Sequence, residues 1–93
     1  MFGISNDFIN KCVEHFGEKG QLDILQEECA ELIKACSKYK RAKNAWEQYE
    51  CIKDMTEELT HVAISSAVVS KLLNIDEQDI QKEVDKKAEK YNF

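Results

Sequence analysis

Leu25–Ile33, with the sequence LQEECAELI, places three carboxylates within five positions and flanks them with apolar residues. In an α-helix, residues three or four positions apart share a face, so Glu28 and Glu31 are expected to point the same way. Like charges at this spacing repel one another, and solvent, cationic partners or a bound cation must offset the repulsion. The stretch therefore predicts a helix that carries a charged site beside its apolar face.

A second stretch, Glu57–Val62 (EELTHV), repeats this arrangement later in the chain. Glu58 and His61 are again three positions apart, so they share a helical face. Two helices that each present such a pair can bring four potential ligands together. The sequence thus predicts one metal site between two helices.

The composition bounds the fold class. The 93 residues are 43% hydrophobic and 33% charged, which suits one soluble domain covering residues 1–93. The chain has no Pro, and its three Gly all lie in the first twenty residues, so long helices are favoured. The formal net charge of −5 argues against a nucleic-acid partner, which usually meets a basic surface.

Apolar spacing predicts an all-α bundle of about four helices. The first helix is capped by Ser5 or Asn6 and ends near Gly17, and the others cover about 21–39, 45–73 and 77–91. In the second helix the expected core stripe is Leu22, Leu25, Cys29, Leu32, Ile33 and Cys36, beside a stripe of Ile24, Glu28, Glu31 and Ala35. The third helix also has two coherent stripes, one of which holds Asp54, Glu58, His61, Ser65 and Val68. Helices with two usable faces suit a bundle completed as a homodimer or homotetramer.

The four cysteines lack a CxxC spacing and are expected to be reduced, buried thiols, which indicates a cytoplasmic protein. No signal peptide is recognisable at the start. No apolar stretch approaches the roughly 20 residues that span a membrane, so no membrane partner is expected.

The ligand types narrow the choice of metal. Hard cations such as Mg²⁺ take oxygen ligands, which Glu28, Glu31 and Glu58 could supply. The imidazole of His61 is softer and better suited to Mn, Fe, Co or Zn.

These motifs resemble those of the MazG-type, all-α nucleoside triphosphate pyrophosphohydrolases. Glu27–Leu32 (EECAEL) is similar to their EExxE motif, and Glu58–His61 lines up with their ExxD motif. Phe16–Gly17 and Gln21 resemble the lead-in, and Lys86–Asn92 resembles the Lys-rich closing helix. The resemblance covers most of the chain.

The resemblance implies a function. Nucleoside triphosphates, ribo or deoxy, would be hydrolysed to monophosphate and pyrophosphate, a nucleotide-pool housecleaning activity that depends on Mg²⁺, with Mn²⁺ as the alternative. It places the metal on Glu28, Glu31, Glu58 and His61. Catalysis would fall to Glu27, Glu28 and Glu31, with Glu27 supporting the site or orienting a water. Lys87 and Lys90 would hold the phosphates of the substrate.

His61 departs from the family pattern, which has Asp at this position. An imidazole in place of a carboxylate removes a negative charge and weakens the hold on Mg²⁺. Asp54, about one turn before Glu58 on the same stripe, is placed to compensate. Without that compensation, the metal is Mn²⁺-like or catalysis is reduced or lost.

Two other functions stay open. Glu58 and His61 also have the Glu-x-x-His spacing of di-iron carboxylate bundles, and a short ferritin-like protein can complete a di-iron site by dimerising. Alternatively, the chain is a non-catalytic helical interaction protein whose acidic residues only make it soluble.

Overall fold

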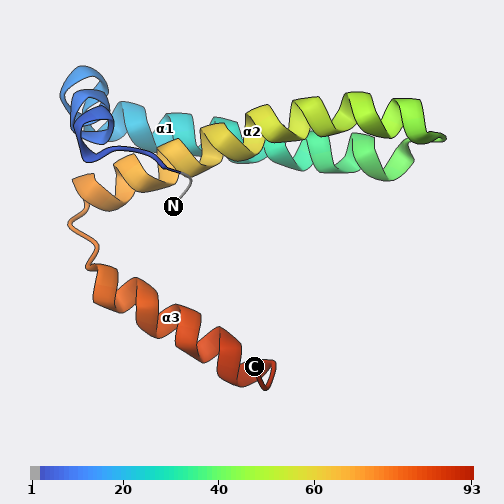
Figure 1. Cartoon of the computed structure of the whole chain (residues 1–93). Coiled ribbons are helices and arrows are strands. Elements are labelled where there is room, and N and C mark those ends of the chain that lie inside the picture. The colour runs from blue at the N-terminus through green and yellow to red at the C-terminus, as the bar shows by residue number, and fades with distance from the viewer. Residues whose placement is uncertain (1–2) are drawn as a thin grey trace.

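The computed structural model describes residues 3–93, and within this range all regular structure is helical. It forms α1 (Asn6–Arg41), α2 (Ala45–Leu72) and α3 (Glu77–Lys90). Figure 1 shows α1 and α2 side by side as a long hairpin, with α3 projecting away from one end of it. The all-α class is confirmed.

α1 begins at a Ser5 cap, whose side chain accepts a hydrogen bond from the Phe8 amide at 3.1 Å. The helical conformation breaks at Gly17, so a first helical segment ends there as predicted, and a second segment follows directly within α1. Gly17 has φ +70° and ψ 171°, a conformation that suits a residue without Cβ. The buried Gln21 side chain spans this kink, where its Nε2 donates to the Cys12 carbonyl at 3.4 Å. The described residues therefore form three elements, the first of which consists of two helical segments joined at a kink.

A tight connection, residues 42–44, turns the chain back from α1 into α2. The Asn44 side chain caps α2 by accepting a hydrogen bond from the Glu47 amide at 2.9 Å. The Glu47 carboxylate in turn accepts from the Lys43 amide at 2.7 Å. These reciprocal bonds fix the tip of the hairpin and hence the register of the two helices.

α3 is separated from the hairpin by a short, well-defined break. Asn74 adopts φ +53° just after α2, as expected for a helix end, and the Asp76 side chain caps α3 by accepting from the Gln78 amide at 2.8 Å. Within the described range, α3 packs against neither α1 nor α2 (Figure 1). The radius of gyration is 15.8 Å, whereas a compact chain of this length would have about 12 Å. The single chain is thus an open shape.

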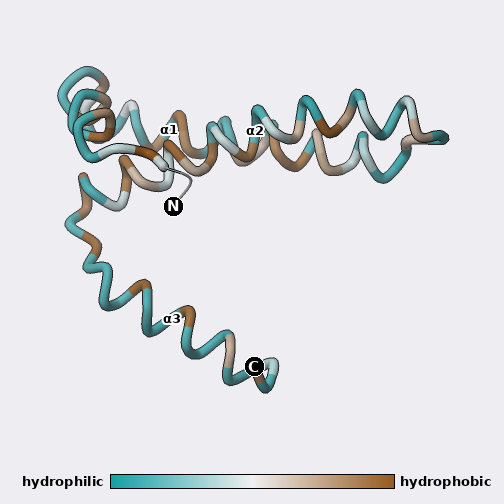
Figure 2. Tube along the Cα trace, viewed as in Figure 1, coloured by the Kyte–Doolittle hydropathy of each residue, from teal (hydrophilic) through white to brown (hydrophobic). Residues whose placement is uncertain are grey.

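The core of the hairpin is small. Ala35, Ala63, Val68 and Val69 are its buried apolar residues, accompanied by the buried polar residues Gln21 and Ser65. Ala35, Ser65 and Val68 belong to the stripes that carry the acidic residues, so those two stripes face each other across the hairpin. The hydrophobic residues in Figure 2 accordingly lie along the hairpin and alternate with hydrophilic ones.

Part of the predicted core stripe is exposed instead. Leu22, Cys29 and Ile33 lie at the surface of the single chain, with Ile33 68% exposed. The physical reason is that α1 has only one packed neighbour, and one neighbour covers only one of its two apolar faces. All four cysteines are free thiols, and three of them are half-buried rather than buried. Among the described residues, no helix combines the length and the apolar character that crossing a bilayer requires.

Candidate metal centre

Three side chains converge between α1 and α2. Glu28 comes from α1, whereas Glu58 and His61 lie about one turn apart on α2. One potential ligand atom from each lies within 4.8 Å of the other two. The helical spacing of Glu58 and His61 and the register of the hairpin together create this cluster.

His61 lies at the centre of the cluster. Its Nδ1 is 3.0 Å from Oε2 of Glu28 and 3.9 Å from Oε2 of Glu58. In the tautomer protonated at Nδ1, the imidazole donates to the Glu28 carboxylate. The glutamate side chains are only 24% (Glu28) and 19% (Glu58) exposed, and that of His61 is 42% exposed. The site is therefore half-buried and open on the histidine side.

Glu58 has a carboxylate oxygen that lacks a hydrogen-bond donor among the described residues. Its Oε2 is buried and accepts no hydrogen bond from any described residue. The pKa of Glu58 is raised, mainly because its carboxyl is buried and next because the Glu28 carboxyl lies beside it. Glu31 raises this pKa further, and His61 lowers it. A buried carboxylate oxygen without a donor is costly in a metal-free chain. A cation at this point would supply the missing positive charge.

The donor set fits a divalent cation. Two carboxylates and one imidazole give two hard oxygen donors and one borderline nitrogen donor, which suits Mn²⁺ or Fe²⁺ better than Mg²⁺. Three protein ligands also leave coordination positions for water or substrate oxygens. Glu28, Glu58 and His61 could therefore hold a metal ion.

Glu31 lies outside the three-residue cluster. Its carboxylate accepts a hydrogen bond from Lys34 at 3.3 Å, and its side chain is 52% exposed. It nevertheless borders the same groove as Glu58. Glu27 is exposed on α1. Asp54 forms an ion pair with Lys38 at 3.8 Å rather than joining the cluster.

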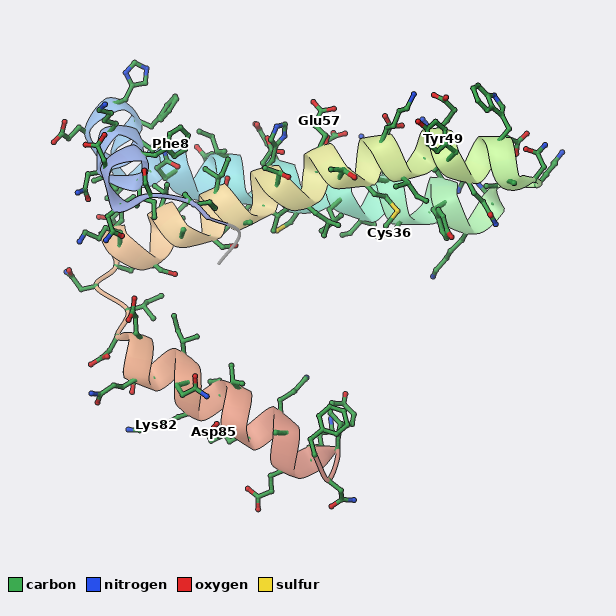
Figure 3. The ribbon with its side chains drawn as sticks, viewed as in Figure 1. Phe8, Cys36, Tyr49, Glu57, Lys82 and Asp85 are labelled. Carbon is green, nitrogen blue, oxygen red and sulfur yellow. The ribbon has the colours of Figure 1, made fainter. Side chains whose placement is uncertain are left out.

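Lys87 and Lys90 lie on α3, away from the candidate centre in the single chain (Figure 1). Figure 3 shows other α3 side chains, Lys82 and Asp85, projecting where no part of the hairpin is next to them. Within one chain, these lysines and the three-residue cluster are therefore separate.

Two grooves extend from the cluster toward the tip of the hairpin. The proximal groove has a volume of about 570 Å³ and is lined by Glu31, Ile33, Lys34, Ala35, Ser37, Lys38, Arg41, Asp54, Glu57 and Glu58. The distal groove, of about 270 Å³, is lined by Lys38, Arg41, Ala42, Trp46, Glu47, Glu50 and Cys51. Lys38 and Arg41 line both grooves, so the two grooves are neighbours.

Sequence reasoning missed the cationic face of the proximal groove. The helix was expected to end near Tyr39, whereas α1 continues to Arg41, so that Arg41 joins the helix that carries Lys34 and Lys38. Lys34, Lys38 and Arg41 then follow one another at intervals of four and three on one helical face. That spacing was the available signal.

The fold and the cluster define a helical-hairpin protein with a candidate divalent-metal centre. In comparisons with known proteins, no protein-family model, curated protein or solved structure matches the chain.

Proposed function

We propose that the chain is a metal-dependent hydrolase that converts nucleoside triphosphates into monophosphates and pyrophosphate. The observation that carries the proposal is the convergence of Glu28, Glu58 and His61, with one oxygen of Glu58 buried and without a donor. The order and spacing of these residues along the chain also resemble the two motifs of the MazG-type pyrophosphohydrolases. A hydrolase acting on a polyanion needs positive charge at the site, and a cation held by the three side chains of the cluster would supply that charge.

The bound ion would stabilise charge on the phosphoryl groups and lower the pKa of a water. The chain's own residues supply the remaining functions. Glu28, Glu58 and His61 hold the ion, and Glu31 is the nearest further carboxylate along the proximal groove. Glu27, exposed on the same helix, would orient a water molecule or support the site.

We also propose that the working form is a homodimer or homotetramer. The hairpin leaves large apolar side chains exposed, including Ile33 (68%), Ile52 (49%) and Leu59 (48%). α3 likewise exposes Ile80 and Val84 and has no partner within the described chain. A second copy would bury these faces, and it offers a route by which Lys87 and Lys90 of one copy approach the centre of the other.

The direct test of the reaction is product analysis. The protein is incubated with a panel of canonical and modified nucleoside triphosphates, in parallel with Mg²⁺ and Mn²⁺. Equal amounts of pyrophosphate and nucleoside monophosphate support the proposal. Release of orthophosphate, or of no product with either metal, contradicts it.

Glu31→Gln tests the fourth ligand implied by the resemblance. This variant should lower metal affinity and turnover while leaving the helical content intact, because Glu31 lies on an exposed helical face. Glu14→Gln, which removes an exposed carboxylate before the kink, is the matched control. Unchanged turnover in Glu31→Gln contradicts this assignment.

A second candidate is a ferritin-like di-iron protein. One observation favours it: the cluster consists of one glutamate from α1 and a Glu-x-x-His pair from α2, without Glu31. Two such clusters brought together by a dimer could form a di-iron site. Oxygen consumption on addition of Fe²⁺, with no hydrolysis of nucleotides, would favour this candidate over the hydrolase.

A further inference from the structure

The two neighbouring grooves are lined by cationic and aromatic side chains that the metal centre does not use. The proximal groove begins at Glu58 and passes Lys34, Lys38 and Arg41. The neighbouring distal groove is lined by Lys38 and Arg41 as well, and by Trp46. An anionic ligand that reaches Glu58 would meet these three cations, which lie among the carboxylates of Glu31, Asp54 and Glu57, and an aromatic ring in the neighbouring groove.

The cations are available to a ligand. Lys34 and Lys38 have side chains that are 72% and 62% exposed, and their ion pairs with Glu31 (3.3 Å) and Asp54 (3.8 Å) are surface pairs, which contribute little and are readily exchanged. No acidic group among residues 3–93 lies within ion-pair distance of Arg41. Cations in the last turn also complement the negative end of a helix. That effect does not account for Lys34, which lies about two turns before the end of α1 and lines the same groove.

Trp46 lies at the far end of the path. Trp46 is 68% exposed, and its ring lies 5.9 Å from the ring of Tyr49 in a tilted arrangement. Figure 3 shows Tyr49 on the same outer part of α2, near the tip of the hairpin. Trp46 precedes Glu58 by twelve positions, which corresponds to roughly 18 Å along a helix. That distance is comparable to the length of an extended nucleoside triphosphate.

We propose that the two grooves form the nucleotide-binding path of this protein, in which Lys34, Lys38 and Arg41 contact the phosphate groups and Trp46 stacks on the base. The proposal rests on the function proposed above and gives that substrate an orientation, with the phosphates toward Glu58 and the base toward the hairpin tip. Guanidinium and ammonium groups bind phosphate oxygens by charge-assisted hydrogen bonds. Stacking on an aromatic ring holds any of the bases, because every base has a π-face.

The distal groove also predicts weak discrimination between bases. Glu47, one of its two carboxylates, accepts from the Lys43 amide at 2.7 Å, whereas Glu50 forms only an exchangeable surface pair with Lys53 at 3.4 Å, so hydrogen-bond recognition of the base by a carboxylate would rest on Glu50 alone. Stacking with few free hydrogen-bonding groups carries little information about base identity. Purine and pyrimidine triphosphates should therefore bind with affinities of the same order, with purines favoured by their larger ring.

The test uses the fluorescence of Trp46, which is the single tryptophan of the chain. The full-length protein is titrated with α,β-methylene adenosine triphosphate, which cannot be cleaved between its α and β phosphates, once with Mg²⁺ and once with EDTA. Saturable quenching of Trp46 is expected in both conditions, and it is expected to be tighter with Mg²⁺. Because binding is measured without turnover, the result does not depend on catalysis.

Matched variants separate the path from non-specific charge effects. Arg41→Gln should weaken binding roughly tenfold, since it removes a charge-assisted hydrogen bond. Lys11→Gln removes the same charge from an exposed residue before the kink and should leave binding unchanged. Circular dichroism checks that both variants keep the wild-type helical content.

The outcomes distinguish this inference from the proposed function. If nucleotide quenches Trp46 but no nucleotide yields pyrophosphate, the binding path is supported and the proposed hydrolase function is contradicted. Pyrophosphate release without quenching of Trp46, or equal loss of binding in Arg41→Gln and Lys11→Gln, overturns the path and leaves the hydrolase standing. Blue-shifted Trp46 emission that does not respond to nucleotide also overturns it, because a second copy would then cover the ring.

Discussion

His61 Nδ1 lies 3.0 Å from Oε2 of Glu28, a residue 33 positions earlier in the chain. In the metal-free chain, a proton on Nδ1 joins the two groups across the hairpin. An ion bound by Nδ1 and the carboxylate must replace that proton, because a metal is ligated by the lone pair of the neutral imidazole. The hydrogen bond therefore holds two prospective ligands at the separation that an ion would bridge.

The buried carboxyl of Glu58 gives a prediction about pH. Burial and the Glu28 carboxyl raise the folded-state pKa of Glu58, so the metal-free folded state binds this proton more tightly than the unfolded state does. The resulting stabilisation is complete below the ordinary glutamate pKa and is lost as the pH rises through the raised pKa. Glu58→Gln, which cannot titrate, should remove this part of the pH profile in urea unfolding measured from acid to neutral pH.

Glu57→Gln is the control for that experiment, since Glu57 is an exposed carboxylate next to Glu58 and projects outward from α2 (Figure 3). It should keep the wild-type profile. Identical profiles for the wild type and Glu58→Gln would mean that Glu58 is solvated rather than held against Glu28.

His61→Asp tests the choice of metal. In this variant a third carboxylate replaces the softer imidazole. The affinity for Mg²⁺ should therefore rise by roughly tenfold, a typical size for changes at a metal site, and the affinity for Fe²⁺ should fall. Calorimetric titration of each metal measures both changes. His15→Asp adds the same charge at the only other histidine, which is exposed and lies before the kink, and should change neither affinity. Loss of all metal binding in His61→Asp would favour the di-iron interpretation.

The sequence predicted most of the helical architecture because the ends of the helices have local causes. Asn44 and Asp76 cap α2 and α3 through side-chain bonds within a few residues, and these caps depend on no distant contact. The break at Gly17 was predicted, but the direct continuation into a second segment was harder to predict, because a glycine with positive φ can be followed by a loop or by another helical segment. Which of the two occurs depends on packing around the kink, where the buried Gln21 bonds to Cys12.

The candidate centre was predictable only in part, because helical spacing says which residues share a face but not which side chains meet across the hairpin. Glu58 and His61 share a face by spacing alone, and Glu28 lies on the stripe that faces them. Glu31 is rotated from Glu28 by about 60° around the helix, since each residue turns about 100°. In the structure its exposed carboxylate pairs with Lys34 and lies outside the cluster.

Val68 should be the most sensitive position of the small core. It is fully buried, and truncating it leaves a cavity that one partner helix cannot refill. Val68→Ala should lower the free energy of unfolding by about 1–3 kcal/mol. Val84→Ala on α3, where the residue is 53% exposed, is the matched control and should have little effect in dilute solution. Equal effects of the two substitutions would contradict the position of the core.

Ile33 tests the proposed association. Its side chain on α1 is 68% exposed in the single chain, so a second copy is expected to cover it. Ile33→Glu should shift the sedimentation coefficient from that of a dimer or tetramer toward that of a monomer, with the helical content unchanged. Lys19→Glu changes an exposed residue near the kink and should not affect association. A wild type that sediments as a monomer at high concentration would contradict the proposal.

The most direct test of the metal centre is a titration of Mn²⁺ into the wild-type and Glu58→Gln chains, followed by the electron paramagnetic resonance signal of free Mn²⁺. The wild type should take up the ion saturably and become more stable, by about 2.7 kcal/mol when the free ion is at 100 times its Kd. The variant should lose this uptake while remaining folded. Equal uptake by both chains, or no uptake by either, would contradict a metal centre formed by Glu28, Glu58 and His61.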